Sequence, residues 1–137
     1  MLAGTKEFIE KAKLNRQRLG GGMRQAGIIA APGIYALENM IERLKDDNDK
    51  AKQLAEKLSS IEGLFINLID VPTNIISVTI HHNEMDADKL INELRGKRIK
   101  VKKIGTKKIR MIVHYLITNE HIDYVVSRFR ELLEGKG

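Results

Sequence analysis

A glycine run followed by an arginine is the stretch of this sequence best suited to chemistry. Gly20, Gly21 and Gly22 lead into a segment that we expect to start a helix near Met23, and Arg24 lies beside that start. Glycines expose backbone N–H groups, and a helix N-terminus next to an arginine attracts anions such as phosphate. The spacing matches neither the Walker nor the dinucleotide-binding pattern. From the residues alone, a phosphate site and a flexible turn between helices both remain open.

A second arginine, Arg110, lies in a segment with the two-residue period of a β-strand. Its side chain should point to the face opposite Ile109 and Met111. A planar guanidinium can hold a carboxylate through paired hydrogen bonds. The alternative is a solvated arginine in a lysine-rich segment, and the residues alone favour that plainer interpretation.

The lysine-rich segment around Arg110 raises the question of nucleic-acid binding. Its basic residues run from Lys97 to Lys108, in a chain whose net charge is +6. Such residues can contact phosphates, but the segment has no aromatic side chain for base stacking and no recognition motif. We therefore expect a solvated surface and argue against nucleic acid, with a basic nucleic-acid-binding module kept as the rival function.

The sequence predicts no metal site. His81 and His82 are adjacent on a predicted strand and point to opposite faces, so they cannot easily share one metal ion. The chain has no cysteine, which excludes thiolate ligands and disulfides. We expect His114 to organise a strand end rather than to transfer protons.

Hydrophobic periodicity predicts the elements that would position these residues. Apolar residues recur at helical spacing after Thr5, a suitable N-cap, and the glycine run ends that helix. We expect the second helix to break at Pro32–Gly33 and a long helix to follow from Ile34 to Leu58. Further helices are predicted at Asp86–Arg95 and after Thr118. The predicted strands are Leu64–Ile69, Ile76–Ile80, Ile99–Ile104 and Ile109–Val113.

These elements predict an α+β fold, with helices packed on one side of a small, mostly antiparallel sheet. Residues 33–137 would form that unit, whereas residues 1–32 contain no strand and fit it poorly. Hydrophobic residues make up 42% and charged residues 31% of the 137 residues, which is typical of soluble globular domains. The uncharged run Gln25–Leu37 is too short to span a bilayer, and the first residues do not resemble a secretory signal, so we expect a cytoplasmic protein without a membrane segment.

The run LGGGMRQAG, Leu19–Gly27, closely resembles a segment of the low-specificity threonine aldolases, in the aromatic amino acid lyase and threonine aldolase superfamily. The resemblance extends over nearly the whole chain in one register. The other matching segments are Gly4–Ala12, Ala30–Leu37, Arg43–Asp47, Pro72–Ile75 and Ile109–His114. This chain departs from the family at Val113 and Leu116, where threonine and aspartate are usual, and at Asn48, where histidine is common.

The resemblance implies the aspartate-aminotransferase-like fold, which is fold type I of the pyridoxal-phosphate enzymes. Residues 1–32 would be the tail of the large cofactor-binding domain, and residues 33–137 the small carboxy-terminal domain. The family match implies that Arg24, Gly21 and Gly22 lie near the phosphate of pyridoxal phosphate. It also implies that Arg110 holds the α-carboxylate of an amino-acid substrate.

The implied reaction, in amino-acid metabolism, is cleavage of a β-hydroxy-α-amino acid such as threonine to glycine and an aldehyde. The resemblance assigns no catalytic residue to this chain, because the cofactor lysine of the family would precede Met1. The chain is therefore expected to be a fragment, inactive alone, that forms a homo-oligomer or joins a partner chain carrying the large domain. A subunit of a split enzyme is the alternative within the same family.

Overall fold

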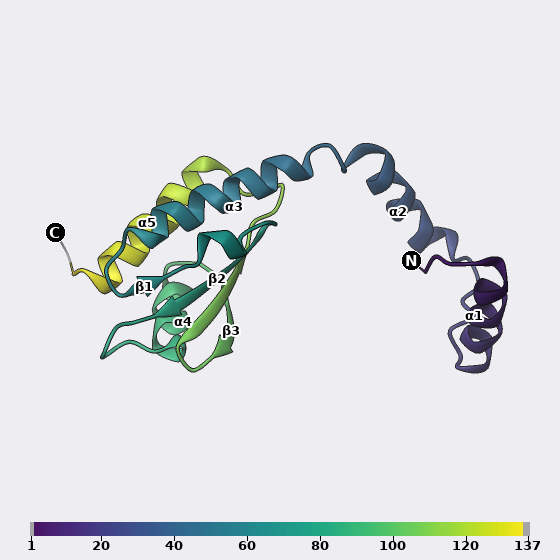
Figure 1. Ribbon diagram of the computed structural model, residues 1–137, viewed down its shortest axis with the longest axis horizontal. Helices are drawn as coiled ribbons and strands as arrows, with labels where there is room; N and C mark the ends of the chain where they lie inside the picture. The colour runs from purple at the N-terminus through teal and green to yellow at the C-terminus, as the bar shows by residue number, and fades with distance from the viewer. Residues whose placement is uncertain (1, 136–137) are drawn as a thin grey trace. The chain divides into compact units, whose positions relative to one another are not determined.

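The computed structural model describes residues 2–135, which form two compact units. The first unit ends at Ile41 and the second begins at Glu42. The first contains two helices, α1 (Lys6–Arg18) and α2 (Gly27–Asn39). The elements of the second, shown in Figure 1, are α3 (Leu44–Ser59), β1 (Leu64–Phe65), the short 3-10 helix η1 (Leu68–Asp70), β2 (Ile75–Ile80), α4 (Ala87–Gly96), β3 (Lys102–Gly105), β4 (Lys108–Ile112) and α5 (Asn119–Leu133).

The second unit is the expected α+β fold, with helices on one face of a sheet. The strands lie in the order β1-β2-β4-β3, and each neighbouring pair is antiparallel. Helices α3 and α5 lie side by side against the sheet, and α4 contacts both α5 and β3 (Figure 1). Buried residues of the helices and of alternate strand positions form one core, in which Leu58, Ile76, Ile109 and Phe129 are fully buried.

The first helix begins and ends as its sequence predicts. Thr5 accepts a hydrogen bond from the N–H of Phe8, and Gly20 ends the helix with φ +77°. The N–H of Gly20 donates to the carbonyl of Gln17, and that of Gly21 donates to the carbonyl of Arg16. This is the Schellman arrangement, in which the residue after the C-cap adopts the left-handed conformation that glycine tolerates best.

The expected helix break at Pro32–Gly33 is wrong. Pro32 lies inside α2, and the break comes instead between Asn39 and Leu44, where α3 begins. Proline removes the hydrogen bond to the carbonyl four residues earlier, which belongs to Ile28. Ile28 is 78% exposed, so water can reach this part of the helix and satisfy that carbonyl. Helix α2 therefore runs across the predicted domain boundary between residues 32 and 33. The expected helix start near Met23 is also wrong, because residues 24–26 form a turn, with Gln25 at φ +51°, and α2 begins only at Gly27.

Two strands are shorter than predicted. Strand β1 stops at Phe65, and the Asn67 side chain then accepts the N–H of Ile69 at the start of the 3-10 helix. Strand β3 begins at Lys102 rather than Ile99. No helix in residues 2–135 is both long enough and apolar enough to cross a membrane.

The end of α4 explains the late start of β3. The N–H of Arg98 donates to the carbonyl of Arg95, and the N–H of Ile99 donates to the carbonyl of Leu94. This is a second Schellman arrangement. It ties residues up to Ile99 to the end of α4, so they cannot pair with β4. Its left-handed position is occupied by Arg98, with φ +61°, instead of glycine.

Replacing Arg98 by glycine should stabilise the chain. An L-residue in the left-handed region costs about 1–2 kcal/mol, which exceeds the roughly 0.4–1 kcal/mol of unfolded-chain entropy that glycine adds. We expect Arg98→Gly to raise the free energy of unfolding by roughly 0.5–1 kcal/mol, measured by guanidinium chloride denaturation. The matched control, Arg95→Gly within α4, should lower it by up to about 1 kcal/mol. A destabilised Arg98→Gly variant would contradict this account of the α4 terminus.

Candidate functional site

The face of the sheet opposite the helices carries the candidate site. Along β4, Ile109 and Met111 are buried, whereas Lys108 and Ile112 are exposed and Arg110 is half-buried. Successive side chains of a strand point to opposite faces, so Arg110 lies on the uncovered face, as its spacing predicts. Helices α3, α4 and α5 all contribute to the core on the other side.

The neighbours of Arg110 across the sheet are a hydroxyl and a cation. Ser77 of β2 and Lys102 of β3 lie directly opposite it in the two flanking strands. The Nε of Arg110 is buried and finds no hydrogen-bond partner within residues 2–135. An unpaired buried donor costs free energy that an anionic ligand can recover. The surroundings therefore fit a carboxylate better than a cation.

A shallow hollow of about 160 Å³ lies on the same face. Ser77, the partner of Arg110, lines it together with Lys108 and Thr79. The ring of Phe65 borders it, stacked on His81 with centroids 5.7 Å apart. Asp70 also lines the hollow, and its carboxylate accepts a hydrogen bond of 2.8 Å from Asn67. The hollow therefore combines one acid and one cation with polar groups and an aromatic ring, which suits a small polar ligand such as a zwitterionic amino acid.

Arg24 and the glycine turn belong to the first unit, whereas Arg110 belongs to the second. Arg24 is exposed and makes no hydrogen bond or ion pair with residues 2–135. A Cβ at Gly21 would come within 3.2 Å of the Arg16 carbonyl, so a side chain there would require the turn to shift by a few tenths of an ångström. At Gly22 a Cβ would meet only Gln17, at an ordinary 3.7 Å. The turn therefore does not need a glycine at position 22. The missing side chain leaves the backbone of Gly22 accessible to solvent.

A buried ion pair near the start of α3 was not predicted. Asp47 is 4% exposed and accepts two hydrogen bonds from Arg43, of 2.6 and 3.1 Å. The hydrogen bond that Arg43 donates to the Asp47 carboxylate raises the pKa of Arg43 above its ordinary value. The guanidinium also lies 5.3 Å from the ring centroid of Tyr115. The spacing of four residues signals an Arg43–Asp47 pair, but no local pattern indicates the contact with Tyr115.

The segment after β4 is organised by His114. Its Nδ1 accepts the N–H of Leu116, and its carbonyl accepts the N–H of Ile117 at 2.8 Å. His114 thus shapes the turn before α5, and Arg43 holds the neighbouring Tyr115. Together these contacts fix the end of the strand that carries Arg110.

Three lysines of the basic segment are engaged in contacts within the chain. Lys97 pairs with Glu131, and Lys103 pairs with Asp88. The Nζ of Lys107 donates to two backbone carbonyls, 2.6 and 2.7 Å away. These contacts hold the β3–β4 hairpin and leave fewer cations available for a polyanion. The two neighbouring histidines are also engaged separately, because His81 stacks on Phe65 whereas His82 accepts an N–H from Glu84.

Comparisons with known proteins identify relatives over nearly the whole chain. A family model described as beta-eliminating lyase matches residues 1–81. Low-specificity L-threonine aldolase 1 of Arabidopsis thaliana is 35% identical over 134 residues, which are 97% of this chain and 37% of that protein. Low specificity L-threonine aldolase of Escherichia coli K12 is 31% identical over 133 residues, 97% of this chain and 38% of that protein. The chain thus spans less than two-fifths of the length of these relatives.

A solved structure shares the fold. The cystine C–S lyase C-DES, in complex with its product cysteine persulfide, superposes with a TM-score of 0.64 at 19% sequence identity. The match covers 77% of this chain and 28% of that lyase. A variant of the same lyase carries glycine covalently linked to its pyridoxal phosphate cofactor. The expected fold class and the resemblance to threonine aldolases are both confirmed.

The unpaired Nε of Arg110 should lower the free energy of unfolding of the isolated chain. Arg110→Met keeps the apolar stem and removes the buried Nε, so we expect the free energy of unfolding to rise by about 1 kcal/mol. Chemical denaturation of the chain without ligand measures it. Lys108→Met, on the same strand and face, is the control and should change stability by less than about 0.5 kcal/mol. A clear loss of stability in Arg110→Met would show that the guanidinium already has a partner.

Proposed function

The chain belongs to the beta-eliminating lyase family, and from that premise we propose that it is the carboxy-terminal part of a pyridoxal-phosphate-dependent carbon–carbon lyase. The proposed reaction is cleavage of a β-hydroxy-α-amino acid, such as threonine, to glycine and an aldehyde. One observation carries the proposal at the level of the residues, namely the unpaired guanidinium of Arg110 on the uncovered face of the sheet.

Arg110 is proposed to hold the α-carboxylate of the substrate. A guanidinium presents parallel N–H donors to the two oxygens of a carboxylate, which fixes the orientation of the amino acid as well as binding it. Lys102 and Lys108 add positive charge on the same face without an acidic neighbour across the strands from Arg110. Because β4 is hydrogen-bonded on both sides in the sheet, Arg110 is held on a rigid element.

The glycine turn is proposed to approach the phosphate of pyridoxal phosphate. Arg24 is exposed, and its side chain has no partner within residues 2–135. The turn has room for a side chain at Gly22, so the glycine there serves instead to keep the backbone accessible to a ligand. Gly21 supports this geometry by allowing the tight turn. These features fit a dianionic group, which arginine and accessible backbone N–H groups can bind.

The two arginines are proposed to bind different groups, the phosphate of the cofactor and the carboxylate of the substrate. When bound, pyridoxal phosphate supplies an electron sink for the charge left on Cα as the Cα–Cβ bond breaks. Arg24 would fix the cofactor through its phosphate, and Arg110 would fix the substrate through its carboxylate. Each contact would reduce the freedom of the group that it binds, which lowers the entropic part of the barrier.

The chain is proposed to be inactive alone, because it covers only 37–38% of the relatives and neither arginine transfers a proton or forms a covalent bond in this scheme. The large domain would then come from a longer form of the protein or from a partner chain, as in a split enzyme. The surface of this chain that contacts the large domain would include α2, where Ile28, Ile29 and Tyr35 are 78%, 68% and 61% exposed. Exposed apolar residues of this density favour a homo-oligomer or a partner chain.

A chimera tests the proposal. This chain would replace the aligned 133-residue part of the Escherichia coli threonine aldolase, and aldehyde release from threonine would be measured with pyridoxal phosphate present. We expect the chimera to cleave threonine and the isolated chain to show no turnover. In the chimera, Arg110→Met should raise KM for threonine roughly ten- to a hundredfold, since a charge-assisted hydrogen bond contributes about 1.5–3 kcal/mol.

Matched variants separate substrate binding from cofactor binding. Arg24→Met and Gly22→Ala should weaken the affinity for pyridoxal phosphate and leave KM for threonine at saturating cofactor nearly unchanged. Lys52→Met, which removes an exposed cation of α3 outside the candidate site, should change neither quantity by more than about threefold. Turnover by the isolated chain would refute its proposed inactivity, and an unchanged KM in Arg110→Met would refute the role of that arginine.

A further inference from the structure

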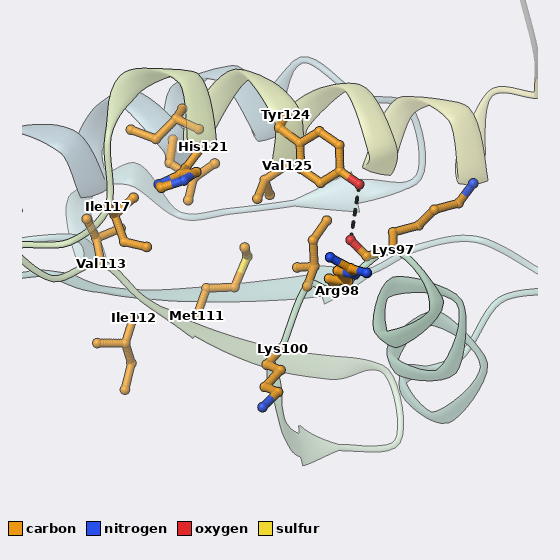
Figure 2. A pocket seen from close by; sticks show the side chains of 13 residues that line it. Lys97, Arg98, Lys100, Met111, Ile112, Val113, Ile117, His121, Tyr124 and Val125 are labelled. Carbon is orange, nitrogen blue, oxygen red and sulfur yellow. Dashed lines mark hydrogen bonds between the residues drawn. The ribbon is translucent and has the colours of Figure 1, made fainter.

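An apolar cavity of about 390 Å³ lies between α5 and the segment that joins α4 to β3. Figure 2 shows Tyr124 and Val125 projecting from α5 toward Met111 and Arg98 on the opposite wall. Its volume lies within the range of about 300–1,000 Å³ typical of small-molecule pockets. The cavity is separate from the candidate site, because neither Arg110 nor any residue that lines the hollow beside it lines the cavity.

The cavity exists because β3 is shorter than β4. The pairing of β3 with β4 begins at Lys102 and Arg110, whereas β4 continues to Ile112. The Schellman turn holds Ile99 against the core, so the residues before Lys102 do not extend the sheet. The last part of β4 therefore borders an opening that α5 covers from one side only.

The charge around the cavity is positive. Lys97 is engaged, since its Nζ pairs with Glu131 and its carbonyl accepts the hydroxyl of Tyr124 at 3.1 Å. The side chains of Arg98 and Lys100 make no hydrogen bond or ion pair within the described part of the chain, and none of the described lining residues is acidic. In Figure 2, Lys100 points away from α5, which leaves Arg98 as the unpaired cation of the cavity wall.

The conformation of Arg98 is the second observation. It occupies the left-handed position of the Schellman turn with φ +61°, where glycine would be unstrained. Local backbone strain is concentrated at binding and catalytic sites, where a particular side chain is needed at that position. Here the strained residue brings a free guanidinium to the wall of an apolar cavity.

We propose that this cavity binds an amphipathic monocarboxylate of the medium-chain fatty acid class. Its apolar chain would lie among Met111, Ile117 and Val125, and its carboxylate would pair with the guanidinium of Arg98. An apolar lining with one convergent charged group is the usual composition of a site for such a ligand. Occupancy would tie the α4–β3 connection to α5 and so stiffen the edge of the sheet.

Binding of decanoate to the complete 137-residue chain tests the proposal. Calorimetric titration should show saturable binding at one site per chain. Methyl NMR signals of Ile117 and Val125 should shift on binding, whereas those of Ile28 and Ile29 on the exposed helix α2 should not. Decanol, which lacks the carboxylate, should bind about tenfold more weakly than decanoate.

The variant Arg98→Gly keeps the turn and removes the cation. It should weaken decanoate binding about tenfold and leave decanol binding unchanged. Val125→Phe should fill the cavity and prevent the binding of both molecules. Lys52→Ala, which removes an exposed cation of α3 outside the cavity, is the matched control and should bind decanoate as the unaltered chain does.

Three results would overturn the proposal: no saturable decanoate binding, equal decanoate affinity in Arg98→Gly, or signal shifts confined to α2. The Arg98→Gly comparison remains decisive if Val125→Phe fails to fold, because glycine is compatible with φ +61°.

Discussion

Helices cover only one face of the sheet, and the rest of the second unit depends on this constraint. Helices α3, α4 and α5 supply apolar residues to a single core, so the strands must alternate between buried and accessible positions. That alternation places Arg110 opposite Ile109 and Met111 and leaves its Nε without a partner. A position that is costly for the isolated chain becomes useful when an anion binds there, which is the usual exchange of stability for function.

The contacts around the strand ends keep this arrangement rigid. Arg43, at the start of α3, pairs with the buried Asp47 and also lies over the ring of Tyr115. His114 shapes the turn that leads into α5. These groups touch no candidate ligand. They fix the direction in which β4 leaves the sheet and therefore the position of Arg110, in the way that supporting residues commonly hold a binding group.

Periodicity predicted the helices and the face of Arg110, because those features depend on residues close in sequence. It failed at Pro32, where solvent exposure of α2 made a broken hydrogen bond tolerable, and at β3, where the turn at Arg98 delays the start of the strand to Lys102. The contact of Arg43 with Tyr115 and the cavity beside α5 join distant segments, so no local pattern reveals them. The roles of Arg24, Gly21, Gly22 and Arg110 were inferred from family resemblance and remain predictions.

The central claim is that Arg110 grips the carboxylate of an amino acid. A crystal structure of the chimera with pyridoxal phosphate and glycine tests it most directly. The account predicts that the guanidinium nitrogens of Arg110 lie within about 3 Å of the glycine carboxylate oxygens. A structure in which another cation holds that carboxylate, while Arg110 faces solvent, would contradict it.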